Sequence, residues 1–552
     1  MLRLLLANRI RATVAALRGA GWAQLAVVCA FIALGAAMIT MAYLGFLRGF
    51  GFLIAEDQVG PLVARYVLET SFSIVFFLGV ASFVASSTSF FYRAEELNIL
   101  ATLPIPPVKL FFYRFLMAAI SAAWPVALIS VPAMAAYAVV MGGGFAQVLF
   151  VALIIGLFTA AISLVGALLS FVLAPFARKL PSPALWIAEA VVFFGVAAIM
   201  AKQIVPRSIM VTFAGAVDAP GVAIAERRVS EMFALMPSSP FVRAIIQSLT
   251  ENGVAPYLLL KILFTLVILS VVLMMIARRS YLSLWQSYGS RPMPVLKKES
   301  AQRKTFPRIF KLGYGFLLEK DLLMLTRDGG EMARAASLGA LLVLFVATLR
   351  AVADIGQLGS PQLFTFAVTF AFASVGYLAL TFCMRFVFPA FSLEGRGAWA
   401  VLSSPIHAHE LYSWKFFFWV AVLELLTVPA IFVAAVLFSL PSALTFLLMM
   451  AMACVAATVV AMTLGQGTLF PRFRERNPDL IATTPAGLSA TAIGIAYLLI
   501  IVRYVHVAMS SYLALGVVPA RDIFGIIIVS FALAGTYWTV VTRSLDRIEI
   551  VS

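Results

Sequence analysis

Charged residues are scarce in this sequence: Asp, Glu, Lys and Arg make up only 12% of the 552 residues, whereas 63% are hydrophobic. A soluble domain is typically about half apolar and about a quarter charged. The composition therefore excludes an ordinary soluble protein and predicts a polytopic membrane protein. The net charge of +16 could suggest nucleic-acid binding, but the basic residues gather between apolar runs, which is against a nucleic-acid partner.

Cysteine and histidine are also scarce, with three residues each. Cys29, Cys383 and Cys454 lie singly within apolar runs, so we expect neither a disulfide framework nor a metal cluster. His407 and His409 are two residues apart and do not share a helix face. An interfacial polar cluster is therefore preferred to a metal site at these histidines.

Several catalytic signatures are absent from the sequence. It contains no Gly-x-x-x-x-Gly-Lys-Ser/Thr loop and no Gly-Lys pair, and therefore lacks the consensus that cradles the phosphates of ATP. It also contains no His-Glu-x-x-His or Gly-x-Ser-x-Gly motif. We therefore expect no catalytic residue and no cofactor on this chain.

Twelve apolar runs are long enough to cross a membrane as helices, which takes about 20 residues. They lie near residues 23–44, 68–90, 112–140, 146–174, 184–203 and 255–277, and then near 335–353, 362–390, 412–438, 442–466, 486–505 and 523–542. We expect an all-α membrane protein of about 12 transmembrane helices in two six-helix halves. The halves are residues 1–290 and 311–552, joined by a basic linker at 291–310, and a basic helix at the membrane surface precedes each half.

The distribution of Lys and Arg predicts the orientation. If both termini lie on the same side of the membrane, most of the 40 basic residues fall in segments on that side. In membrane proteins the cytoplasmic segments carry the excess of Lys and Arg. We therefore expect a multi-pass protein of the cell (inner) membrane with both termini and the linker in the cytoplasm. The loop at 204–254 is basic yet external on this scheme, and we expect short helices there around Ile224–Met236.

Two polar segments, Phe91–Met117 and Phe391–Phe417, interrupt the apolar runs in a similar way. Each contains an acid, an apolar helical face, a proline and a base. The matched pairs are Glu95 with Glu394, Leu100 with Trp399, Leu103 with Leu402, Pro104 with Pro405, and Arg114 with Lys415. The spacing indicates an internal duplication, in which an even number of spans before the linker makes the halves parallel. Two unrelated loops with common residue types are the alternative.

Acidic residues inside apolar runs are the candidates for a substrate pathway. Burying a carboxylate in lipid is unfavourable, so Glu189 and Glu424 are either functional or neutralised by a proton or a neighbouring helix. The alternative is a carboxyl group that serves only packing. A proton- or sodium-coupled carrier would usually need more intramembrane charges than these.

The chain resembles the permeases of ABC-2 type exporters in three features. They are the surface helix, the six spans, and an inner loop of Glu-x4-Leu-x2-Leu-Pro-Ile followed by a basic residue. The resemblance covers nearly the whole chain, with two such halves fused. It implies that coupling helices dock on a dimeric cytoplasmic ATP-binding-cassette ATPase. The residues implied in this contact are Glu95, Glu96, Leu100, Pro104, Glu394, Trp399, Leu402 and Pro405.

By this resemblance, the chain is expected to be a permease subunit that exports an amphiphilic substrate such as a lipid, a peptide or a drug. ATP and magnesium are expected on the partner ATPase alone, and membrane lipids are the other partner. The alternatives are an ion-coupled secondary transporter built of two repeats, and a membrane scaffold or intramembrane enzyme.

Overall fold

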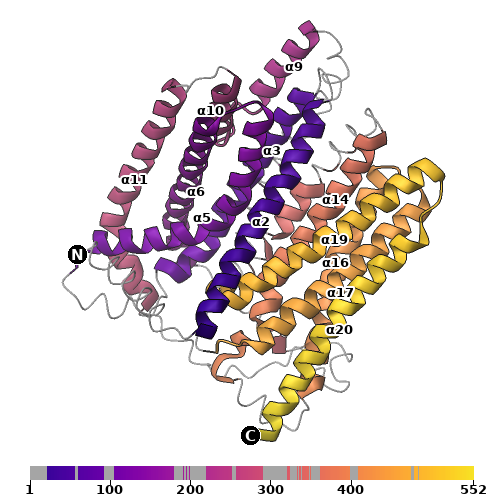
Figure 1. The fold of residues 1–552 in the computed structure, drawn as a ribbon. Coiled ribbons are helices and arrows are strands. Elements are labelled where there is room, and N and C mark those ends of the chain that lie inside the picture. The colour runs from indigo at the N-terminus through magenta and orange to yellow at the C-terminus, as the bar shows by residue number, and fades with distance from the viewer. Residues whose placement is uncertain are drawn as a thin grey trace. The chain divides into compact units, whose positions relative to one another are not determined.

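The computed structural model describes residues 22–55, 60–91, 105–179, 219–250, 256–289, 338–346, 361–397, 408–473, 478–482 and 484–551, with single residues or pairs elsewhere in 191–198 and 320–353. Every regular element among these residues is a helix (Figure 1). The chain divides into two compact units, Met1–Gln302 with Thr326–Leu341, and Arg303–Leu325 with Leu342–Ser552. The boundaries predicted at residues 290 and 311 stay predictions.

Eight helices in the described part of the chain are long and apolar enough to cross a membrane. They are Ala64–Val84, Phe145–Ala174, Pro256–Gln286, Phe364–Gly395, Glu410–Leu437, Ser442–Leu469, Pro485–Leu515 and Ala520–Ser544. All eight coincide with predicted spans, which confirms a helical polytopic protein. Eight is nevertheless fewer than the twelve expected, partly because the span at 184–203 lies largely outside the described residues and the span at 335–353 is described only in part.

The N-terminal unit contains four long helices that pack side by side, then two short helices and one more long helix (Figure 1). They are α2 (Trp22–Ala55), α3 (Gly60–Phe91), α5 (Pro107–Val140), α6 (Phe145–Lys179), α9 (Ala219–Met232), α10 (Ser239–Thr250) and α11 (Pro256–Gly289). Aromatic rings fill the core of the unit, with Phe111 between Phe91, Phe171 and Tyr281 at centroid distances of 5.3–5.4 Å. The short helices predicted around 224–236 are confirmed by α9, and α10 follows it.

The C-terminal unit contains five long helices and several short helical segments. They are α14 (Pro361–Phe382), the π-helix η2 (Cys383–Val387), the 3₁₀ helices η3 (Phe388–Ala390) and η4 (Ser392–Gly397), then α16 (Ala408–Leu437), α17 (Ser442–Leu469), α18 (Pro478–Ala482), α19 (Pro485–Leu515) and α20 (Ala520–Val551). Helix α17 is the centre of the unit, because it packs against α14, α16, α19 and α20. Its small residues permit close packing without a bulky side chain between helices.

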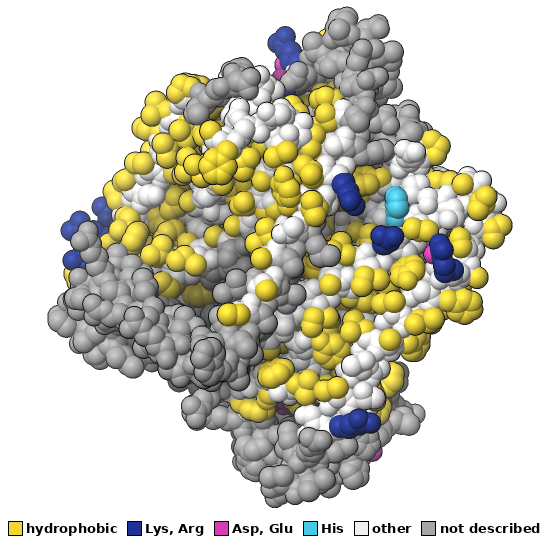
Figure 2. Space-filling model, in the orientation of Figure 1, with side chains coloured by type: hydrophobic (Ala, Val, Ile, Leu, Met, Phe, Trp, Pro, Cys, Tyr) yellow, Lys and Arg dark blue, Asp and Glu magenta, His cyan; other side chains and the backbone are white. Residues whose placement is uncertain are grey.

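The outer faces of the helices are apolar, as a lipid environment requires. Tyr257, Leu260, Phe264, Val267 and Val271 are exposed on α11 at spacings of three and four residues, which form one face of a helix. Hydrophobic side chains cover most of the described surface in Figure 2, with Lys and Arg in a few separate places. This surface excludes a water-exposed bundle and suits helices that contact lipid.

Candidate functional site: a charged cluster in the C-terminal unit

The candidate site begins where α14 loses its regular helical form. The chain passes through the π-helix η2 and the 3₁₀ helix η3, where Pro389 lacks the backbone donor that an α-helix needs. Helix η4 follows, with Gly395 at φ +57°, and presents Glu394. Single-turn π-helices inserted in α-helices occur frequently at functional sites.

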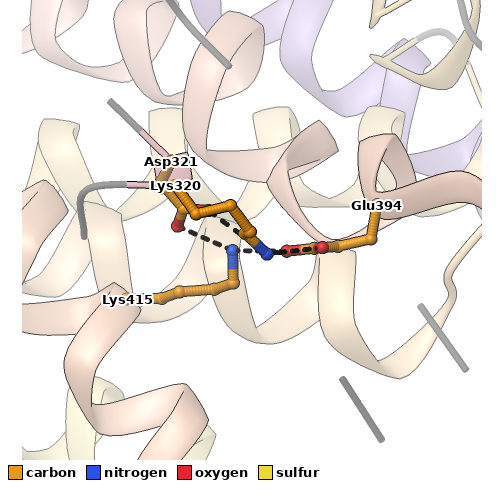
Figure 3. A network of polar contacts seen from close by, with 4 residues as sticks. All are labelled: Lys320, Asp321, Glu394 and Lys415. Carbon is orange, nitrogen blue, oxygen red and sulfur yellow. Dashed lines mark hydrogen bonds and ion pairs between the residues drawn. The ribbon is translucent and has the colours of Figure 1, made fainter. Parts of the chain in front are cut away.

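Four charged side chains meet at this point (Figure 3). Lys320 Nζ lies 2.6 Å from both carboxylate oxygens of Glu394 and 3.6 Å from Asp321 Oδ1. Lys415 Nζ, on the second turn of α16, lies 2.8 Å from Asp321 Oδ2 and 2.9 Å from Glu394 Oε1. Each lysine therefore contacts both acids, and the cluster is a closed arrangement with no net charge.

Burial makes the cluster sensitive to the loss of any member. The side chain of Lys415 is 3% exposed and that of Glu394 is 7% exposed, whereas Lys320 reaches 31%. Removing one partner of a buried ion pair typically destabilises a protein by about 3–5 kcal/mol, because it leaves the other charge uncompensated. The cluster therefore holds together three segments that are far apart in the sequence.

Two further contacts lie in the same region, and the first of them attaches the end of α17. The Ser392 hydroxyl of η4 accepts a hydrogen bond of 3.0 Å from the backbone N–H of Arg472, just beyond the end of α17. The ring of Phe391 lies 5.6 Å from Lys415 Nζ, within the range of a cation–π contact. The charged cluster thus connects α14, α16, the end of α17 and the segment that carries Lys320.

The structure describes only two of the predicted site residues. Glu394 lies in the charged cluster, and Glu424 lies on α16, partly buried. The others, Glu95, Glu96, Leu100, Pro104, Glu189, Trp399, Leu402 and Pro405, lie outside the described residues. The coupling role of the first group and the pathway role of Glu189 and Glu424 stay predictions.

Lys320 and Asp321 were not predicted as site residues. Their sequence pattern offered an indication, because Glu319, Lys320 and Asp321 are three consecutive charges between apolar residues. Charges in such surroundings are unfavourable unless they find partners. In the described residues no group of three or more His, Cys, Asp or Glu side chains is placed to hold a metal ion.

The helices and their apolar surfaces define a polytopic α-helical membrane protein with a buried ion-pair cluster. Residues 22–545 match the family described as "Putative ATP-binding cassette", and the chain belongs to that family. Comparison with curated proteins and with solved structures gives no match. The family match places the protein among ATP-binding-cassette transporters.

The family match corrects four expectations. The family description names an ATP-binding cassette on this chain, which contradicts all four. They are the resemblance to ABC-2 permeases, the role of a permease subunit separate from its ATPase, the absence of enzymatic activity, and the placement of ATP and magnesium on a partner alone. The ion-coupled carrier is not supported either. These expectations rested on a short motif of common residue types and on one missing consensus loop, which do not identify a family.

The family description implies ATP and magnesium on this chain, but the described residues do not fit these groups. Phosphate binding needs cations and backbone amides directed at the phosphates. Both lysines of the charged cluster already contact carboxylates, and the sequence lacks the Gly-rich phosphate-binding consensus. We therefore derive no chemical step through ATP from these residues.

Proposed function

We propose that this protein acts in ATP-binding-cassette transport across a membrane, and that the charged cluster of Lys320, Asp321, Glu394 and Lys415 is the joint that moves its C-terminal helices together. The closed arrangement of four charges, three of them with nearly buried side chains, carries the proposal. Two helical segments and the residues at 320–321 cannot separate there without exposing an unpaired charge to apolar surroundings, which is strongly unfavourable. Movement applied to one segment is therefore transmitted to the others.

We also propose that the two units are parallel repeats. The turn between α5 and α6 and the turn between α16 and α17 support this. Gly143 N–H donates to Ala138 C=O at 2.8 Å, and Leu440 N–H donates to Ala435 C=O at 2.9 Å, so both pairs are 297 positions apart. The intervening residues, Gly142 and Ser439, both have positive φ. Helices commonly end with such a residue, so the support comes from the matching offset of 297 positions.

Aromatic contacts on the same helices give further support. Phe111 of α5 packs edge-on against Tyr281 of α11 at 5.3 Å, and Tyr412 of α16 packs edge-on against Trp538 of α20 at 5.3 Å. Phe111 and Tyr412 are 301 positions apart, as are Arg114 and Lys415. Helix α5 has 34 residues and α16 has 30, so about one helical turn accounts for the change in offset from 301 to 297.

The proposal includes the predicted placement in the cell membrane. Both termini, the basic linker and the charged cluster would face the cytoplasm, following the excess of Lys and Arg on that side. Docking of the Glu95–Leu103 and Glu394–Leu402 segments on a dimeric ATPase partner stays part of the proposal. Copurification under mild detergent conditions checks whether such a partner accompanies the chain.

The joint is tested with a fluorophore near the cluster. Phe417 is exposed on α16, and Phe417→Cys labelled with an environment-sensitive dye, in a Cys29→Ser, Cys454→Ala background, reports movement of this helix. We expect MgATP to change the fluorescence of the purified protein together with any copurified chains. We expect Lys415→Met to abolish that change, because Asp321 and Glu394 lose a shared cation.

Two variants keep this test decisive. Lys415→Arg retains the charge and has the same residue type as Arg114 at the matched position, so the ATP response should persist. If Lys415→Met fails to fold, Lys320→Met removes the more exposed cation and should also abolish the response. If the labelled Phe417→Cys protein with an intact charged cluster shows no ATP response, the proposed role in ATP-binding-cassette transport is refuted. An unchanged response in the Met variants would refute only the role of the cluster as a joint.

A further inference from the structure

Two polar side chains are exposed on α19 at the end of the C-terminal unit opposite to the charged cluster. Arg503 and His506 are three positions apart, so they lie on one face of the helix. Thr369, which contacts His506, lies near the start of α14, whereas Glu394 of the charged cluster lies beyond the end of α14. The ion pairs of the described residues do not involve Arg503, so none of them compensates its charge.

A hydrogen bond between α14 and α19 orients the His506 ring. Its Nδ1 lies 3.3 Å from the hydroxyl oxygen of Thr369. That hydroxyl donates its single proton to the Thr365 carbonyl oxygen at 2.7 Å, so it can only accept from His506. Nδ1 therefore carries a proton, and Nε2 is the nitrogen left for another partner. The two helices are close here, because a Cβ at Gly376, two turns along α14, would clash with the Leu498 side chain of α19.

The position of these side chains along α19 matches the surface of a bilayer. Helix α19 has 31 residues, or about 46 Å, and is longer than the hydrocarbon core of about 30 Å. About 20 residues cross that core, so a span that begins at Pro485 ends near Val505. Arg503 and His506 flank this level, and Leu499 is exposed one turn deeper. The two polar side chains therefore lie at the depth of the lipid headgroups, where the anionic group is phosphate.

We infer that Arg503 and His506 bind the phosphate of a phospholipid headgroup on this face of α19. The guanidinium donates two parallel hydrogen bonds to phosphate oxygens, the geometry that arginine forms with this group. An anion beside Nε2 favours the doubly protonated imidazole, in which Nε2–H donates to a further phosphate oxygen. Thr369 is a positioning residue, since it acts through the ring of His506. The inference concerns the C-terminal unit alone and depends neither on the proposed joint nor on ATP.

Fluorescence quenching by spin-labelled lipids tests the site. Leu499→Cys, in a Cys29→Ser, Cys454→Ala background, takes a fluorophore on the same face one turn deeper, which leaves the phosphate site open. Phosphatidylglycerol and diacylglycerol with identical acyl chains, each with a doxyl group near the headgroup end of one chain, are titrated separately into the purified protein in detergent. We expect half-maximal quenching at an about tenfold lower mole fraction of phosphatidylglycerol, the change produced by about 1.4 kcal/mol.

Three variants separate a defined site from general attraction to lipid. Arg503→Gln and His506→Gln should each reduce the preference for phosphatidylglycerol, and the double variant should be quenched equally by the two lipids. Both side chains are exposed, so the variants should fold. Thr369→Val keeps the shape of the side chain and removes the acceptor for Nδ1–H. It should reduce the preference in the parent protein and have no further effect in His506→Gln.

Arg521→Gln is the matched control. Arg521 is 81% exposed at the start of α20 and lies 3.5 Å from Asp522, so its loss lowers the local charge equally but should leave the preference intact. Equal losses in Arg521→Gln and Arg503→Gln, or equal quenching by the two lipids in the parent protein, would overturn the inferred site. Inorganic phosphate in large excess should leave the preference unchanged. If it removes the preference, the site takes soluble phosphate and its assignment to a lipid is wrong.

Discussion

Ser439 is the only non-glycine residue in the described part of the chain with positive φ, at 53°. On the proposed repeat its counterpart is Gly142, at φ 78°. A left-handed conformation costs a residue with a Cβ about 1–2 kcal/mol. Glycine avoids this strain, but its greater conformational freedom in the unfolded chain offsets part of the stabilisation. We expect Ser439→Gly to stabilise the protein by about 0.5–1 kcal/mol, measured as a higher thermal unfolding temperature in detergent.

Two variants test the reason for that gain. Gly142→Ser should lower the unfolding temperature, because it creates the strain in the other turn. Ser510→Gly, at an exposed position inside α19, should also lower it, since glycine in a helix costs about 1 kcal/mol relative to alanine. A Ser439→Gly protein that is less stable than the parent would show that the Ser439 side chain matters more than its backbone strain.

At the scale of elements, the contact between α17 and η3 depends on Gly467. A Cβ at this position would clash with the Phe388 carbonyl oxygen, which is backbone and cannot move aside independently. Overpacking of this kind typically costs about 1–3 kcal/mol. We expect Gly467→Ala to lower the unfolding temperature and to reduce the ATP response of the labelled Phe417→Cys protein, because η3 leads directly into the segment that presents Glu394.

A glycine with free space around it is the control for that variant. Gly156 of α6 has nothing within 4 Å of its Cβ position, so Gly156→Ala should be neutral or slightly stabilising, in line with the helix propensity of alanine. Equal effects of the two substitutions would mean that close packing at η3 is not what Gly467 provides.

At the scale of the whole molecule, the proposed parallel repeat predicts which residues face the same side of the membrane. Ala146 and Ala443 are both exposed, follow the matched turns, and are 297 positions apart. Parallel halves place both on the same side, because each would follow the same number of spans within its half. We expect Ala146→Cys and Ala443→Cys to react with a membrane-impermeant thiol reagent from the same side of sealed vesicles.

Phe470→Cys supplies the opposite reference. Phe470 is exposed just beyond the far end of α17, so it should react from the other side. Reaction of Ala146→Cys and Ala443→Cys from different sides would instead indicate an inverted repeat, and the proposed arrangement of the halves would be wrong.

Sequence patterns predicted the helices far better than they predicted the biochemical family. All eight helices of the described residues that are long and apolar enough to cross a membrane were expected from long apolar runs. The backbone in lipid must satisfy its own hydrogen bonds and does so within a helix. The prediction of the family was wrong because the motif in the polar loops contains only common residue types. The absence of a consensus loop did not show that the chain lacks an ATP-binding cassette.

The sequence alone thus determined the apolar environment of the helices and the helical fold of the spans. It could not determine which charges meet. Lys320 and Glu394 are 74 positions apart, and Asp321 and Lys415 are 94 apart, with helix α14 between them in the chain. Local periodicity acts over one or two helical turns, so only packing of the helices decides such long-range pairs, and the buried cluster exists because these four charges neutralise one another there.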